Sequence, residues 1–375
     1  MLFPRIYDNL EKYFYNRKIL VIFGPRRVGK TTLIKNYLKN TKSKYKLVNG
    51  DDLSVQEILS SQRLKILADY CANYQLLVID EAQKIPNIGN SLKIIVDNID
   101  NIKIIATGSS SFELLGQVGE PLTGRKISLI LYPLSQLELS KIYNFYELKE
   151  NLDNYLIFGS YPEVTAAKTK NEKIIILNEL VNSYLLKDIL ELEKVKAAKI
   201  LVDLLRLLAF QVGKEVSLNE LANRLKIDVK TVGRYLDLFE KSFILYNLRG
   251  FSKNLRSEIY KKSKYYFFDN GVRNALISNF NDLEKRDDIG ALWENFLVIE
   301  RIKLQSYKKL FTNNYFWRTW EQKEIDWIEE KNGKLYAYEF KYQTPKKTYF
   351  KDFAKIYSPV KSQTITKDNY LDFVI

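Results

Sequence analysis

Short runs of β-branched and other apolar residues alternate with helical stretches from about residue 18 to residue 135. This alternation is typical of α/β domains, in which strands and helices follow one another along the chain. The strands that we predict from it are Ile19–Phe23, Lys46–Asn49, Leu76–Ile79, Lys103–Thr107 and Lys126–Leu131.

The pattern changes near residue 150, where an almost wholly helical stretch begins and continues to about residue 245. Within it, Ser217 and Glu220 have the spacing of a capping box, and Asp228 can cap the helix that follows. That helix carries Lys230 and Arg234 off its apolar face. The strand-like runs after it are Ile244–Phe251 and Lys264–Phe268. The order predicts a winged helix-turn-helix, which can bind DNA, serve as a protein-interaction module or simply pack on the first domain.

Strand-like runs rich in Tyr and Phe return from about residue 264, together with one long helix near residues 290–305. The polar stretch Asn281–Asp288 is the expected linker into this last region. We therefore predict three domains, which suits a chain of 375 residues. They are an α/β core at residues 1–140, a helical segment with the winged helix at 141–280, and an α+β domain at 281–375.

Composition narrows the chemistry that this chain can perform. It has no histidine, which excludes histidine metal ligands, Ser-His-Asp triads and histidine proton shuttles. The net charge of +14 fits either a polyanionic partner such as DNA or an ordinary lysine-rich surface. The single cysteine, Cys71, cannot form an internal disulfide, and neither a signal peptide nor an apolar run of membrane-spanning length is visible. We therefore expect a cytoplasmic protein without membrane contact.

The strand Ile19–Phe23 runs directly into a glycine-containing loop, and a helical pattern follows. The loop reads Gly24-Pro25-Arg26-Arg27-Val28-Gly29-Lys30-Thr31-Thr32. This is the G-x-x-x-x-G-K-T spacing of a P-loop, in the strand–loop–helix context that the motif requires. The glycines let backbone N–H groups face phosphate oxygens, and the helix N-terminus adds a partial positive charge. We expect Lys30 to reach the β- and γ-phosphates of ATP, and the Thr31 hydroxyl to bind Mg²⁺.

A second apolar run, Leu76–Ile79, ends in Asp80 and Glu81. Beside a P-loop, Asp80 fits a Walker B role that holds Mg²⁺ through water, and Glu81 can polarise the attacking water. Taken alone, the two acids could instead cap the next helix. The hydroxyl-rich stretch Thr107–Ser111 could sense the γ-phosphate or form a turn. Arg125 could act as an arginine finger for a neighbouring subunit of a homo-oligomer, or could be a surface arginine.

The last domain contains Asn332-Gly333 between two strand-like runs, and Asn-Gly favours a two-residue type I′ hairpin turn. Closing the hairpin there pairs Lys331 with Lys334. Counting outward, Asp326 lies opposite Glu339. Directly opposed like charges destabilise a sheet, and a divalent cation would remove that penalty.

Glu324 and Lys341 fall on the same face of this hairpin. In the preceding helix, Glu294 has apolar residues three and four positions further on, so its carboxylate is expected to point inward and to need a partner. Together with Asp326, Glu339 and Lys341 it resembles the PD-(D/E)XK nuclease core. The resemblance implies that the three carboxylates bind Mg²⁺ or Mn²⁺ and that Lys341 helps to activate water. The alternative is a surface ion pair of Glu324 with Lys341 beside solvated acids.

Taken in order, the segments GPRRVGKT, LLVIDEAQKIPN, IIATGSSS and LTGRKISLILYPLSQLE resemble AAA-type ATPases of archaea and bacteria. Three later segments agree with this: Phe158–Glu163, Leu186–Ile189 and Tyr266–Gly271. The resemblance implies an α/β P-loop (AAA-type) core, a helical and winged-helix middle and an α+β restriction-endonuclease-like C-terminal domain. The expected function is a Mg²⁺-dependent ATPase that controls a nucleic-acid-processing domain. A nucleotide-switched scaffold for DNA or protein without nuclease activity, and a defence- or toxin-type effector, are the alternatives.

Overall fold

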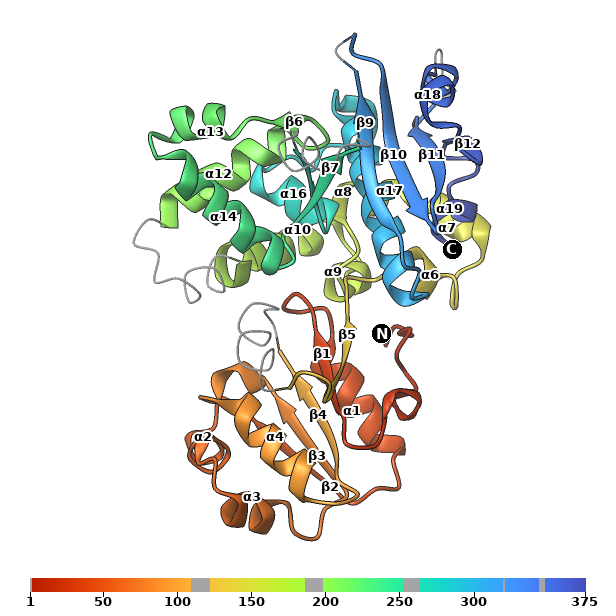
Figure 1. Ribbon diagram of the computed structural model, residues 1–375. Helices are drawn as coiled ribbons and strands as arrows, with labels where there is room; N and C mark the ends of the chain where they lie inside the picture. Colours follow the sequence, from red (N-terminus) through yellow and green to blue (C-terminus); the bar gives the residue numbers. More distant parts are fainter. Residues whose placement is uncertain (1, 109–121, 186–197, 252–262, 320, 344–347) are drawn as a thin grey trace.

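The computed structural model describes residues 2–108, 122–185, 198–251, 263–319, 321–343 and 348–375. Its N-terminal part contains a five-stranded sheet of order β2-β3-β4-β1-β5, in which every pairing is parallel (Figure 1). The strands are β1 (Ile19–Phe23), β2 (Tyr45–Asn49), β3 (Leu76–Asp80), β4 (Lys103–Thr107) and β5 (Lys126–Ile130). They follow the predicted runs, and β1 is buried along its whole length, as expected of a central strand covered on both faces.

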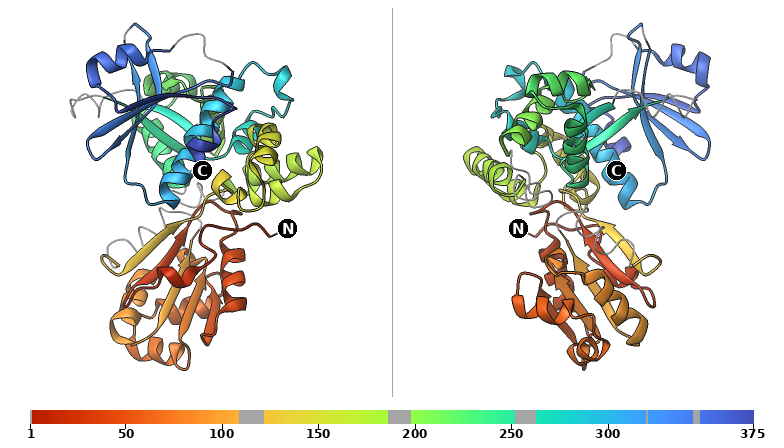
Figure 2. Two further views of the ribbon diagram at one scale, coloured as in Figure 1. Left: turned by 90° about the vertical axis from the view of Figure 1, so that its right-hand side faces the viewer. Right: turned by 60° about the vertical axis from the view of Figure 1, so that its left-hand side comes forward.

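Helices connect successive strands of this core. They are α1 (Lys30–Asn40), α2 (Leu53–Ser60), α3 (Leu64–Cys71) and α4 (Ile88–Asn98). Figures 1 and 2 show the core as one body and most of the remaining chain as a second, with β5 leading from the first towards the second. The second body therefore begins where the core sheet ends.

The helical middle region lies in this second body (Figure 1). Its helices are α6 (Gln136–Leu139), α7 (Phe145–Glu150), α8 (Leu152–Phe158), α9 (Pro162–Ala166), α10 (Lys170–Glu179), the π-helical stretch η3 (Leu180–Leu185), α12 (Ala198–Phe210), α13 (Leu218–Leu225) and α14 (Val229–Lys241). The Ser217 side chain caps α13 and the Asp228 side chain caps α14, as predicted. Within the described ranges, no helix has both the length and the apolar character needed to span a bilayer.

A mixed seven-stranded sheet of order β12-β11-β10-β9-β7-β8-β6 joins the winged-helix region to the last domain. Its strands are β6 (Glu215–Val216), β7 (Leu245–Gly250), β8 (Ser263–Phe267), β9 (Asn313–Arg318), β10 (Glu324–Lys331), β11 (Lys334–Phe340) and β12 (Lys361–Ile365). The helices after β8 are α16 (Asn270–Leu276), α17 (Ile289–Tyr307), α18 (Phe350–Tyr357) and α19 (Leu371–Val374). The two halves of the sheet meet where β7 pairs with β9 through Arg249–Tyr315 and Gly250–Phe316, a junction that we call the seam.

The hairpin of β10 and β11 has the predicted register, because Lys331 pairs with Lys334. Asn332 and Gly333 have φ values of 50° and 71°, and a type I′ turn requires positive φ at both positions. The other edge of β10 is irregular, since its register with β9 shifts between Ile325 and Ile328. A bulge of this kind twists the strand locally. It lies beside the predicted acidic residues of β10.

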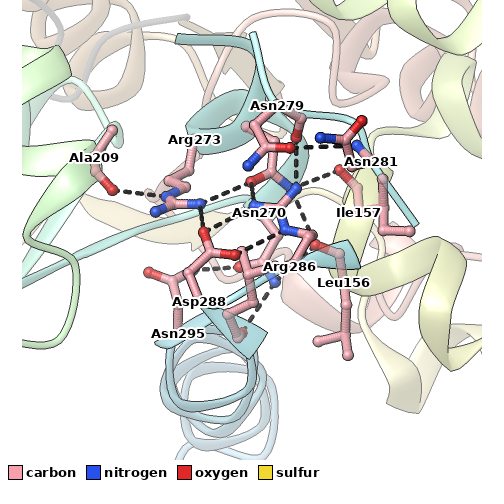
Figure 3. Close-up of polar contacts among 12 residues, drawn as sticks. Leu156, Ile157, Ala209, Asn270, Arg273, Asn279, Asn281, Arg286, Asp288 and Asn295 are labelled. Carbon is pink, nitrogen blue, oxygen red and sulfur yellow. Dashed lines mark hydrogen bonds and ion pairs between the residues drawn. The ribbon is translucent and has the colours of Figure 1, made fainter. Parts of the chain in front are cut away.

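The polar stretch Asn281–Asp288, which we expected to be a linker, is fastened to the helical region (Figure 3). Arg286 is buried, and its guanidinium donates hydrogen bonds of 2.8 Å to both carboxylate oxygens of Asp288. Arg273 of α16 forms a second ion pair with Asp288 and donates a hydrogen bond of 2.7 Å to the carbonyl of Ala209. Buried charges of this kind are tolerated only when they are paired. The stretch is therefore an integral part of the packing.

Asparagine side chains tie α16 to its neighbours in the same cluster (Figure 3). Asn274 donates a hydrogen bond of 2.8 Å to the carbonyl of Ile157, in the last turn of α8. Asn270 donates one of 3.0 Å to the carbonyl of Leu292 in α17, and accepts one of 2.6 Å from Asn295. Ile157 lies in the last turn of α8, where carbonyls lack partners within their own helix, and Asn274 supplies one. These contacts hold α8, α16 and α17 together.

A close approach at Gly159 completes this cluster. Asp269 caps α16 by accepting hydrogen bonds from the N–H groups of Val272, at 3.1 Å, and Ser160, at 2.7 Å. A Cβ atom on Gly159 would lie 1.9 Å from an oxygen of Asp269, and Gly159 has a φ of 71°. Both the contact and the left-handed backbone therefore require glycine. Two of the segments that carry the family resemblance meet here, although they lie far apart in the sequence.

We expect Gly159→Ala to lower the free energy of unfolding by about 3 kcal/mol or more, because it adds a clash with Asp269 to the cost of a backbone conformation (φ 71°, ψ −157°) that is essentially restricted to glycine. Gly333→Ala is a control for positive φ without a clash, since Gly333 has a φ of 71° but no atom within 4 Å of its Cβ position. This control should lose only about 1 kcal/mol. Chemical denaturation followed by tryptophan fluorescence measures both, and equal losses would contradict the role assigned to Asp269.

Candidate nucleotide site and C-terminal carboxylate cluster

The predicted P-loop lies between β1 and α1, at the carboxyl edge of the core sheet. Lys30 is buried, and its ammonium donates hydrogen bonds of 2.8 Å to the carbonyl oxygens of Gly24 and Pro25. Position 24 has to be glycine, because a Cβ atom there would lie 2.0 Å from the carbonyl oxygen of Leu131. The loop is therefore curled around the Lys30 ammonium and closed against the end of β5.

The predicted magnesium ligands contact one another directly. Thr31 donates its hydroxyl proton to Asp80, with 2.7 Å between the oxygens. Thr107, the last residue of β4, donates a hydrogen bond to the other oxygen of Asp80 and accepts one of 3.1 Å from the Glu81 N–H. This network places a hydroxyl and a carboxylate side by side. Both are oxygen ligands of the kind that Mg²⁺ prefers.

Glu81 has a φ of 53°, in the left-handed region that residues with a side chain seldom adopt. One of its carboxylate oxygens accepts a hydrogen bond of 2.6 Å from the Gln83 side chain. Backbone strain of this kind persists where the surroundings enforce it, and it is enriched at functional sites. Here it turns the chain sharply after β3, so that Glu81 lines the same cleft as the P-loop.

The cleft beside the P-loop has a volume of about 530 Å³, large enough for a nucleotide. Its walls come from four parts of the chain, namely the N-terminal segment, the P-loop with the start of α1, Glu81 after β3, and α9. The lining residues are Leu2, Phe3, Arg5, Asp8, Arg26, Arg27, Val28, Gly29, Lys30, Thr31, Thr32, Leu33, Asn36, Glu81, Pro162, Glu163 and Ala166. All the predicted P-loop residues except Gly24 and Pro25 lie on this cleft, whereas Asp80 reaches it through Thr31.

The two arginines of the P-loop face the helical region. Arg27 forms ion pairs with Glu179 at 2.9 Å and with Glu163 at 3.4 Å, so it bridges the loop to α10 and α9. Arg26 lines the cleft and also a small cavity next to Asp269. The loop predicted to hold phosphates is therefore in direct contact with the second body of the molecule.

Arg125 lies at the opposite edge of the core sheet. Its carbonyl accepts a hydrogen bond from the N–H of Ile19, the first residue of β1, and its guanidinium pairs with Asp97 at 2.6 Å. The length of β1, about 16 Å, separates it from the P-loop of the same chain. An arginine finger at this position would have to act on a neighbouring subunit, and that role stays a prediction. Ser109–Ser111 lie outside the described residues.

The predicted nuclease-like residues gather around β10, β11 and α17. The Lys341 ammonium lies 3.4 Å from Asp326 and 4.0 Å from Glu339, so these carboxylates share one face of the hairpin. The group of acids whose oxygens lie within 4.8 Å of one another is Glu294, Glu324 and Asp326, which we call the carboxylate cluster. Glu339 accepts a hydrogen bond of 2.7 Å from the Tyr349 N–H instead.

The electrostatics of this region reflect its burial. Desolvation raises the pKa of Glu294 to about 6, although Lys264 opposes the shift. Burial also raises the pKa of Glu339. For Lys341, burial favours the neutral form, but the carboxylates of Asp326 and Glu339 outweigh it and raise its pKa. Whether Glu294, Asp326 and Glu339 bind a metal stays a prediction.

Two buried cations at these sites were not predicted from the sequence. Lys264 of β8 reaches the carboxylate cluster, and Arg5 donates a hydrogen bond of 2.9 Å to the P-loop carbonyl of Val28. A lysine within a run of buried aromatic residues was a signal for Lys264, because such a charge needs a partner. Nothing in the sequence pattern around Arg5 indicated its role.

Family models match three consecutive parts of the chain. Residues 16–140 match an AAA domain, residues 149–283 a domain of unknown function (DUF8612), and residues 289–371 another domain of unknown function (DUF4143). The N-terminal part of the chain is therefore an AAA-type P-loop domain.

Proteins similar in sequence over most of this chain occur in bacteria and archaea, and the following three are uncharacterised. One from Mycobacterium tuberculosis is 26% identical, covering 88% of this chain and 72% of the relative. One from Methanocaldococcus jannaschii is 27% identical, covering 85% of this chain and 74% of the relative. One from Haemophilus influenzae is 26% identical, covering 89% and 85%. The likeness thus extends over most of the chain in each case.

Two solved structures also show similarity. One is the Holliday junction branch migration motor RuvB of Thermotoga maritima, 17% identical, covering 61% of this chain and 81% of that chain, with a TM-score of 0.29. The other is AMPPCP-bound DnaA of Aquifex aeolicus, which is 18% identical. The match covers 63% of this chain and 85% of that chain, with a TM-score of 0.25.

We expect Thr107→Val to weaken Mg²⁺-dependent ATP binding about tenfold, because it removes the hydroxyl that orients Asp80 while keeping the side-chain volume. Thr107→Ser keeps the hydroxyl and is the matched control, expected to bind like the wild type. Titration of a fluorescent ATP analogue with and without Mg²⁺ measures the effect. Equal affinities of the valine and serine variants would show that the hydroxyl is dispensable.

Proposed function

We propose that this chain is a Mg²⁺-dependent ATPase. The observation that carries the proposal is the convergence of Lys30, Thr31 and Glu81 on one cleft, with Asp80 hydrogen-bonded to Thr31. The Thr31 hydroxyl and the Asp80 carboxylate would hold Mg²⁺, which neutralises phosphate charge when it is bound. The AAA domain match supports nucleotide binding independently of this geometry.

Each of these side chains has a distinct part in the proposed reaction. Carbonyl oxygens keep the Lys30 ammonium inside the loop, and charged phosphate oxygens are stronger acceptors, so the ammonium would move to them. Glu81 would orient and deprotonate the attacking water, and its contact with Gln83 holds the carboxylate at the cleft. Positioning and charge compensation of this kind account for most catalysis of phosphoryl transfer.

We further propose that the nucleotide cycle acts on the C-terminal domain through α17. Arg5 touches Val28 of the P-loop, and the same guanidinium lies 3.5 Å from the hydroxyl of Tyr307, the last residue of α17. Glu294 of the carboxylate cluster lies near the other end of that helix. Since an α-helix rises about 1.5 Å per residue, Glu294 lies about 20 Å along α17 from Tyr307, within one continuous helix.

We expect Lys30→Ala to abolish tight ATP binding, because it removes the charge that faces the β- and γ-phosphates. Glu81→Gln should still bind ATP but hydrolyse it at least about a hundredfold more slowly, since an amide cannot act as a base. Lys35→Ala, an exposed lysine of the same helix α1, is the control and should change neither property. Radiolabelled ATP measures binding and turnover. Wild-type turnover by Glu81→Gln would refute the assignment of the base and favour a different hydrolytic residue.

A second proposed activity is nucleic-acid binding by the winged-helix region. The observation that favours it is that Lys230 and Arg234 are exposed on α14. The residues predicted to form its apolar face, Val232, Leu236 and Phe239, are buried. The second helix of a helix-turn-helix is the one that enters a DNA groove in proteins that use it so. A net charge of +14 also favours binding to nucleic acid, which is a polyanion.

We expect binding to duplex DNA to weaken steeply with salt, because neutralised phosphates release counterions. Lys230→Glu with Arg234→Glu should weaken binding and reduce the salt slope by about two. The matched control is Lys35→Glu with Lys39→Glu, which changes the net charge equally on exposed positions of α1. Fluorescence anisotropy over a salt series measures the slope. Equal effects of the two charge reversals would show that α14 is not the binding surface.

A further inference from the structure

The carboxylate cluster is built from one strand and one helix near the seam. Glu294 comes from α17, whereas Glu324 and Asp326 come from β10. The Lys264 ammonium lies 3.2 Å from Glu294 and forms a closer contact with Glu324. A cation of the protein itself therefore touches two of the three acids.

Lys264 reaches the cluster from the other half of the seven-stranded sheet. It belongs to β8, which is separated from β10 by β7 and β9. Only 1% of Lys264 is exposed, and its ammonium lies 5.2 Å from the centre of the Phe316 ring on β9. The side chain thus crosses the seam beneath the strands that form it. Its burial excludes the reading that it is a solvated surface lysine.

The three acids of the carboxylate cluster also have other partners within the protein. Tyr266, also of β8, donates its hydroxyl proton to Glu294 at 2.6 Å. Asp326 accepts a hydrogen bond of 2.7 Å from the Phe340 N–H and faces Lys341. Arg318 lies 3.5 Å from Glu324. The acids are therefore supplied with donors and with positive charge by the chain itself.

The arrangement fits an ammonium better than a divalent cation. Mg²⁺ binds carboxylate oxygens at about 2.0–2.1 Å and repels any other cation at the same oxygens. An ammonium instead donates up to three hydrogen bonds. Burial disfavours the charged form of Lys264, but Glu294, Glu324 and Asp326 more than offset this and raise its pKa, so that it stays charged.

We propose that Lys264 is the resident cation of the carboxylate cluster, and that it keeps divalent metal off these acids while β8 is docked against α17. The lysine also binds the two halves of the sheet to each other across the seam. Metal occupancy of the C-terminal domain then depends on the position of a strand from the winged-helix region. This inference is independent of the ATPase proposal, since it concerns a separate group of residues.

Mn²⁺ binding to the nucleotide-free full-length chain tests the proposal. All proteins carry Asp80→Asn, which removes the carboxylate proposed to hold Mg²⁺ at the P-loop. With Lys264 in place, millimolar Mn²⁺ should leave the melting temperature unchanged, and titration calorimetry should detect no site. Lys264→Gln should bind one Mn²⁺, and its melting temperature should rise by about 5–10 °C at saturating metal, because the metal binds only the folded state.

Lys323→Gln is the matched control, because Lys323 also pairs with two carboxylates, Asp352 and Glu321, outside the cluster. It should gain no Mn²⁺ site. Mn²⁺ binding by the protein with Lys264 intact, abolished by Glu294→Gln, would overturn the proposal. So would a Lys264→Gln protein that folds and gains no Mn²⁺ site.

Lys264→Gln leaves buried carboxylates without their cation and could fail to fold. In that event Lys264→Gln combined with Glu294→Gln restores the balance of charge and should give soluble, folded protein. Its recovery would support the role of Lys264 as a counter-ion. If the double variant is also insoluble, Lys264 does not act through its charge and the proposal fails.

Discussion

One buried guanidinium joins the two bodies of this molecule. Arg5 donates hydrogen bonds of 2.9 Å to the carbonyl of Val28 and 2.6 Å to that of Tyr132, and it pairs with Glu138 at 2.9 Å. An arginine stays charged at any physiological pH and carries five donors in one plane, so it can serve several acceptors only if they are held in a fixed arrangement. The P-loop, the segment after β5 and the start of α6 are therefore fixed relative to one another by a single side chain.

Helix α17 extends this constraint into the C-terminal domain. Its residues Glu300, Lys303 and Tyr307 lie three and four positions apart, and so form one buried polar stripe. Glu300 accepts a hydrogen bond of 2.6 Å from the Gln136 N–H, and Lys303 donates one of 3.0 Å to the carbonyl of Leu134. Such contacts have directional requirements that apolar packing lacks. These contacts fasten α17 to the segment after β5.

The sequence was sufficient to predict those elements whose structure depends on residues close together in the chain. The strands β1 and β4 begin and end at the predicted residues, and the Asn332-Gly333 turn sets the register of β10 with β11. Each of these features depends on residues close together in the chain. The position of the P-loop between β1 and α1 was also predictable, because the motif and its flanking strand and helix are adjacent in the sequence. Their roles in binding and hydrolysis remain proposals.

The features that the sequence did not reveal depend on partners far away in the chain. Lys264 meets Glu294 and Glu324 only because the seam brings β8 near β10. The hairpin count placed Glu339 opposite Asp326, but it could not show that Tyr349 would donate its N–H to that carboxylate. Asn281–Asp288 looked like a linker because its composition is polar, whereas buried arginine pairs make it part of the packing. In each case a polar side chain has a protein partner that pattern alone cannot identify.

The continuous sheet across the seam also bears on how the chain can be divided. Cutting it near residue 280, where a domain boundary was predicted, would separate β7 from β9 and expose an open strand edge on both fragments. Such edges pair readily with other chains and favour aggregation. The C-terminal fragment would also leave the acids of α17 and β10 without Lys264. The winged-helix region and the C-terminal domain are thus a single unit for expression, and an insertion tag or cleavage site is better placed in the core than between them.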